Sequence, residues 1–132
     1  MPKANPEAAL GEFERLAAAA DVNIDVSTMD EEAAEEMEEM CELLTGAIVD
    51  GSLAVDDQGR AVLAGPDGLS LTFRVPIGKD LIILANAKDG RRMEALVRFI
   101  CALTSQSSDT IEKLPKRPFT LALRLAGFLA AV

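Results

Sequence analysis

Residues 53–76 read LAVDDQGRAVLAGPDGLSLTFRVP, and this stretch determines the fold class. Three short apolar runs lie in it, at 53–55, 60–64 and 69–75. Two turns separate them, at 56–59 and 65–68. Glycine supplies positive φ and proline presets the bend, so such turns join neighbouring antiparallel strands. Apolar and polar residues alternate in the last run, as in a strand with one buried face. We therefore predict a small antiparallel β-meander of about three strands.

The residues on both sides of this meander carry helical patterns. Apolar side chains recur at helical spacing in five segments: 6–20, 28–46, 78–87, 89–104 and 117–132. Thr28 to Glu31 has the form of a capping box at the start of the second segment, and Gly46 is a plausible stop for it. In 78–87 we expect Leu81, Ile82 and Leu84 to point inward. The predicted class is α+β, with acidic N-terminal helices, the meander and a C-terminal helical bundle.

The chain length fits a single ordinary domain. It has 132 residues, of which 49% are hydrophobic, too many for a disordered acidic chain. We expect residues 28–132 to form one α+β domain. Residues 1–27 are expected to form a helix and a linker, and the sequence leaves open whether they pack on the domain or are loosely attached.

The composition argues against an enzyme. The chain has no His, Trp or Tyr, so it lacks an imidazole base, a His-ligated metal and most aromatic platforms for bases. Cys41 and Cys101 are too far apart in sequence for a zinc motif, and we interpret them as small buried hydrophobes. No carboxylate pair stands out as a glycosidase-like site. We expect no cofactor, no metal and no nucleic-acid partner. The first residues lack the pattern of a signal peptide, so we expect a cytoplasmic protein.

Charge is distributed unevenly along the chain. Residues 1–57 hold 16 acidic and two basic side chains, a net of −14, whereas residues 58–132 hold six acidic and 11 basic ones, a net of +5. The two blocks can be solvated faces of one domain. They can also attract each other within the chain, or lead copies to associate head to tail as a homo-oligomer.

Two segments are candidates for binding a partner protein. The acidic segment 28–46 carries a stripe with several methionines, and the last segment is apolar almost all round. Its 15 residues from 118 to 132, interrupted by Arg124, are too few for a membrane span, which needs about 20. Such a helix is either central to a core or covered by another chain. The candidate partner-binding residues are Met37, Met40, Leu121, Leu125, Phe128 and Leu129.

The order of short motifs resembles a known family. A strand with LTFRVP at 71–76 is followed by GKDL at 78–81, a helix ending in ALT at 102–104, and IEKL at 111–114 before a terminal apolar helix. This order resembles the small tail assembly chaperones of Mu-like phages and prophages, over roughly residues 47–132. The motifs mark strand ends and helix caps, and no catalytic residue is implied.

The resemblance implies a non-enzymatic role in the cytoplasm of the bacterial host. Such proteins are thought to coat the long, hydrophobic tape measure protein before the tail tube forms around it, and are then displaced. The implied partners are the tape measure protein and, second, the tail tube protein, and the chain is not expected in the mature virion. Two alternatives remain. One is a small self-assembling structural protein of a phage tail, and the other is an acidic regulator that binds a basic partner through Glu35 to Glu42.

Overall fold

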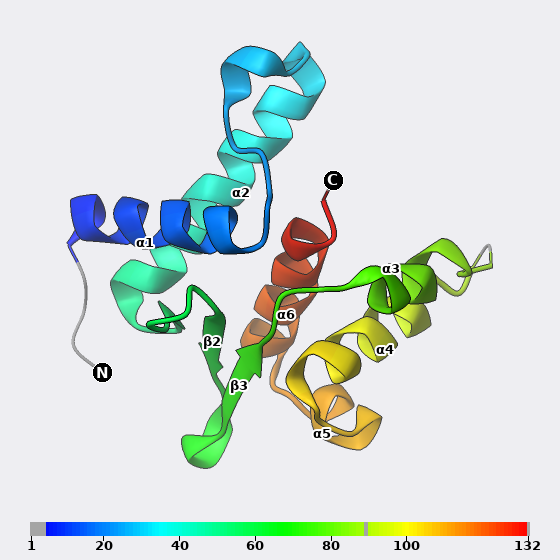
Figure 1. Cartoon of the computed structure of the whole chain (residues 1–132). Helices are drawn as coiled ribbons and strands as arrows, with labels where there is room; N and C mark the ends of the chain where they lie inside the picture. The colour runs from blue at the N-terminus through cyan, green and yellow to red at the C-terminus, as the bar shows by residue number, and fades with distance from the viewer. Residues whose placement is uncertain (1–4, 89, 132) are drawn as a thin grey trace.

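The structure is a computed structural model that describes residues 5–88 and 90–131. Residues 1–4, Asp89 and Val132, which the expected segments 1–27, 89–104 and 117–132 include, lie outside the described residues. Among the described residues there are six α-helices and three strands: α1 (Pro6–Ala19), α2 (Glu31–Asp50), β1 (Leu53–Val55), β2 (Ala61–Ala64), β3 (Ser70–Phe73), α3 (Gly78–Ala85), α4 (Arg92–Thr104), α5 (Ser108–Glu112) and α6 (Lys116–Leu129). In Figure 1, α1 and α2 lie on one side of the sheet and α3, α4 and α5 on the other, with α6 between the two groups. The predicted α+β class is confirmed.

The three strands form the predicted antiparallel meander, in the order β1-β2-β3. One cross-strand row, Leu53, Leu63 and Leu71, is buried and faces the core. β3 ends at Phe73, two residues before the predicted end of that run. The reason is tertiary, because the backbone N–H of Arg74 donates to the carbonyl of Leu103 in α4, at 3.1 Å, rather than to a neighbouring strand.

Helix α2 begins and ends later than predicted. Its N-cap is Asp30, whose carboxylate accepts the backbone N–H of Ala33 at 2.8 Å. The Thr28 hydroxyl instead donates to the Asp25 carbonyl, within a 3₁₀ turn over Val26–Thr28. The helix passes Gly46 and ends at Asp50, before Gly51 at φ 88°. The buried residues of the last turns keep Gly46 helical, since packing overrides its weak helix propensity.

Helix α1 belongs to the hydrophobic core. Phe13 and Leu16 are each 1% exposed, and the ring of Phe13 lies 5.3 Å from the ring of Phe128 in α6, centroid to centroid. The question that the sequence left open is therefore answered for this helix, which packs on the rest of the chain. The core extends across the boundary expected between residues 27 and 28.

A buried ion pair holds the junction between β3 and α3. Asp80 is fully buried, and its carboxylate accepts hydrogen bonds from both terminal nitrogens of Arg74, at 2.7 and 2.8 Å. It also accepts the backbone N–H of Ile77 at 2.8 Å, at the start of α3.

Helix α3 buries only some of the side chains that we expected to point inward. Leu84 is buried, but Leu81 and Ile82 are 37% and 56% exposed, so that expectation was wrong for both.

Candidate partner-binding grooves

A groove follows the seam between α2 and α6. Three hollows of about 350, 290 and 350 Å³ lie along it, and neighbouring hollows share first Met40 and then Leu43. The N-terminal half of α2 borders the C-terminal end of α6, and the C-terminal half of α2 borders its beginning, so the two helices run antiparallel along the seam. We call this the α2–α6 groove, defined by Met37, Met40, Leu43, Leu121, Arg124 and Phe128.

The floor of the α2–α6 groove is apolar and partly made of methionine. Met37 and Met40 are half-buried, while Leu121 and Phe128 beneath them are at most 6% exposed. The wall on α2 is acidic, because it carries the exposed carboxylates Glu36, Glu39 and Glu42. Methionine is flexible and polarizable, so such a floor can adapt to different apolar side chains.

The opposite wall of this groove carries positive charge from α6. Arg117 and Arg124 are both exposed. Arg117 forms an ion pair with Asp50, and among the ion pairs of the described residues it is the one that joins α2 to α6. Arg124 borders the middle hollow together with Glu36 and Glu39. The groove therefore has an apolar floor between two charged walls. The α2 wall carries three carboxylates, and the α6 wall carries two arginines.

The structure brings together four of the six residues predicted to bind a partner. Met37, Met40, Leu121 and Phe128 line the α2–α6 groove. Leu125 and Leu129 line none of the three hollows, although all four of these α6 residues belong to the hydrophobic core. The sequence could not separate these two groups, because a helix that is apolar on all sides gives no period from which to choose a face.

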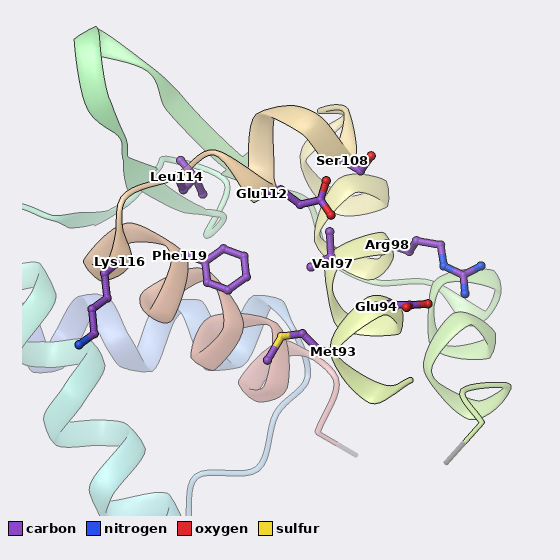
Figure 2. Close-up of a pocket in the computed structure, with 9 residues that line it drawn as sticks. All are labelled: Met93, Glu94, Val97, Arg98, Ser108, Glu112, Leu114, Lys116 and Phe119. Carbon is purple, nitrogen blue, oxygen red and sulfur yellow. The ribbon is translucent and has the colours of Figure 1, made fainter. Parts of the chain in front are cut away.

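A second groove lies between α4, α5 and α6 and has a volume of about 450 Å³. Figure 2 shows Phe119 of α6 opposite Val97 and Met93 of α4, with charged side chains at the rim. Met93 is an apolar residue of the predicted helical segment 89–104, but its side chain is 53% exposed. Met93 lies in the first turn of α4. The spacing of apolar residues does not show whether the first turn of a helix is exposed or packed against another element.

The charged groups of the two grooves are carboxylates and the cations of Lys and Arg. No cluster of Cys, Asp and Glu able to hold a metal ion occurs within residues 5–88 and 90–131. Burial raises the pKa of the Cys41 thiol, and burial likewise raises the pKa of Cys101. A raised pKa lowers the thiolate fraction at neutral pH, so both side chains are weak nucleophiles. What the two grooves offer is apolar contact area with charged edges.

Comparison with known protein families, with curated proteins and with solved structures finds no match to this chain. Across the part of the chain that the structure describes, no helix is both long enough and apolar enough to cross a membrane.

Proposed function

We propose that this protein is a non-enzymatic assembly chaperone that binds apolar helices of the phage tape measure protein in the α2–α6 groove. The observation that carries the proposal is that three neighbouring hollows, joined by shared lining residues, follow one another between α2 and α6. The 14 residues of α6 make it about 21 Å long at 1.5 Å per residue. A client helix of about four turns fits alongside it.

The chemistry of the groove suits a client with many different helical segments. Helix-in-groove recognition uses apolar anchors spaced by three or four residues, and a methionine floor accepts them without demanding one shape. Adaptable surfaces of this kind bind several targets at the expense of specificity. Glu36, Glu39 and Glu42 along the wall favour segments that carry Lys or Arg beside the apolar stripe.

Two further properties support the same role. The net charge of −9 keeps an assembly of many copies on an apolar client in solution. The motif order that resembles the tail assembly chaperones supports the tape measure protein as the client and the tail tube protein as a second partner. In this proposal the chain acts in the host cytoplasm and leaves before the virion is complete.

The proposal is tested by co-expressing the chain with the tape measure protein encoded nearby and measuring the soluble, co-purifying client. We expect the wild-type chain to keep the client soluble. M37Q/M40Q removes two apolar contacts but keeps the length and helix propensity of both side chains. Because each buried methionine contributes about 1.5–3 kcal/mol, we expect the double variant to bind the client about tenfold or more weakly.

The control is M93Q, which makes a single Met-to-Gln change in the groove of Figure 2. We expect it to leave client binding unchanged. Loss of binding in M93Q with retention in M37Q/M40Q would move the site to the groove between α4, α5 and α6. If the client stays insoluble and the wild-type chain elutes alone as a defined oligomer, the chaperone function is refuted and a self-assembling structural protein is the better explanation.

A further inference from the structure

Exposed apolar side chains gather on the hairpin formed by α3 and α4. Seven large hydrophobic residues are exposed among the described residues, and five of them lie between positions 75 and 93. Ile77 and Ile82 are each 56% exposed. The same segment carries exposed basic side chains. We call this surface the hairpin patch, defined by Ile77, Lys79, Leu81, Ile82, Arg91 and Arg92. Clustered apolar exposure of this kind marks an interaction site more often than a random surface does.

A surface of opposite charge lies on α1 and α2. Four exposed glutamates of α2 are spaced by four, three and four residues, so they form one row on the helix. They are Glu31, Glu35, Glu38 and Glu42. At its C-terminal end the row meets a hollow of about 420 Å³ between α1 and α2, with Leu10, Cys41 and Val49 in its lining. We call the row and this hollow together the α1–α2 face.

The α1–α2 face overlaps the α2–α6 groove only at Glu42 and Gly46, which border hollows of both. At 100° per residue, the glutamate row lies on the opposite side of α2 from Met37 and Met40. Leu10, which is 47% exposed, supplies an apolar side chain beside the hollow. This face therefore has the same two components as the hairpin patch, apolar area and charge, with the charge reversed.

The charges of both surfaces are unpaired within one copy. The ion pairs formed within residues 5–88 and 90–131 use neither a glutamate of the row nor a basic residue of the hairpin patch. Like charges four residues apart on a helix repel each other, so the row is destabilising until a cation approaches it. Among the ion pairs of the described residues, Asp50–Arg117 and Asp56–Arg60 join the two charge blocks, and they involve neither of these two surfaces.

We infer that the hairpin patch of one copy docks on the α1–α2 face of the next copy. Lys79, Arg91 and Arg92 then face the glutamate row, while Leu81 and Ile82 enter the hollow beside Leu10. In Figure 1 the α3–α4 hairpin and the helix α1 lie on opposite sides of the molecule, so the contact is head to tail and repeats as an open chain or a ring. Met37, Met40 and the α6 side of the α2–α6 groove stay uncovered in this arrangement, so the inference does not depend on the proposed chaperone function.

Sedimentation velocity over a range of protein concentrations, at low and at high salt, tests the contact. The wild-type chain is expected to associate as its concentration rises, and less so at high salt because the charges are screened. E35K/E38K and R91E/R92E each remove the charge complementarity from one side. Each variant alone is expected to associate about tenfold or more weakly than wild type.

An equimolar mixture of the two variants gives the sharpest result. The intact hairpin patch of E35K/E38K can dock on the intact row of R91E/R92E, and the charge-reversed patch of R91E/R92E can dock on the charge-reversed row of E35K/E38K. The mixture is therefore expected to regain association, with the two variants alternating along the assembly. A mixture that stays monomeric overturns the head-to-tail contact.

Two matched controls separate this contact from general effects. K113E/K116E changes the net charge by the same amount as R91E/R92E at exposed positions outside the patch, and is expected to associate like wild type. I82D is expected to weaken association, and V26D, at another exposed apolar residue, is not. Equal weakening by K113E/K116E or V26D overturns the assignment of these surfaces. A wild-type chain that is monomeric at every concentration overturns the inference. Binding of a different, basic protein would then be the better explanation of the acidic row.

Discussion

Among the described residues, Asp80 is the charged residue whose side chain is fully buried. Its carboxylate depends on Arg74 for its counter-charge. Arg74→Ala leaves this charge buried without a cation, which costs about 3–5 kcal/mol when both partners are buried. Because the Arg74 side chain is 37% exposed, water screens part of the interaction, and we expect a loss of about 2 kcal/mol in the free energy of unfolding. Urea unfolding with an unchanged m-value measures it.

The control for this change is Arg60→Ala, which breaks a pair with Asp56 whose side chains are 39% and 24% exposed. Its expected cost is about 1 kcal/mol or less, because exposed ion pairs contribute little. Equal losses in the two variants would contradict the special role of the Arg74–Asp80 pair.

The same pair makes stability depend on pH. The hydrogen bonds from Arg74 hold the pKa of Asp80 below its usual range, although burial acts in the opposite direction. An unfolded Asp titrates at about 3.9, so the unfolded state binds more protons in acid. This contribution is complete above the unfolded pKa and is lost as pH falls through the folded pKa. We expect Arg74→Ala to unfold at a higher pH than wild type in an acid titration followed by circular dichroism.

At the scale of elements, the turn between β1 and β2 meets the end of α1 at Gly59. This residue has φ +79°, and a Cβ built on it would lie 2.6 Å from the Cβ of Ala19. Gly68 has almost the same φ, +78°, but open space around it. We expect Gly68→Ala to cost about 1–2 kcal/mol from the backbone alone, and Gly59→Ala to cost about 1–3 kcal/mol more from overpacking.

Thermal or urea unfolding of these two variants measures the difference. Similar losses at both positions would mean that α1 does not press against the turn. Leu10→Ala, on the exposed side of α1, serves as a third variant that should change stability little.

Elements were predictable where a local signal defines them. The Gly-rich turns and the period-2 alternation of 69–75 predicted the meander, and the helical segments were placed with errors of a few residues at their ends. The errors have tertiary causes. β3 stops at Phe73 because the next N–H bonds to α4, and α2 continues past Gly46 because its last turns are buried.

At the scale of the whole molecule, the buried side chains of α1 form part of the hydrophobic core. Phe13 of α1 lies against Phe128 of α6, and Ala9, Leu16 and Ala17 are also buried. Removing residues 1–27 exposes the apolar surface beneath these side chains. Burying one Phe contributes about 3–5 kcal/mol, and a whole domain has a stability of only about 5–15 kcal/mol. We expect residues 28–132 alone to lose cooperative thermal unfolding, as measured by circular dichroism.

A point variant keeps this prediction testable if the truncated chain aggregates. Phe13→Ala in the full chain is expected to lower the free energy of unfolding by about 3–5 kcal/mol. A truncated chain that unfolds cooperatively at the wild-type temperature, or a Phe13→Ala variant as stable as wild type, would show that residues 28–132 fold independently.

The sequence by itself determined the α+β class, the positions of the turns and the presence of the long helices, because hydrophobic period and turn residues act over a few neighbours. Only the tertiary structure decided which apolar side chains are free to bind. Leu125 lies in the core while Met37 lines a groove, and Met93 and Ile82 are exposed although their helices predicted burial. These outcomes depend on which distant segments pack beside each helix, and a single helix pattern contains no information about its neighbours.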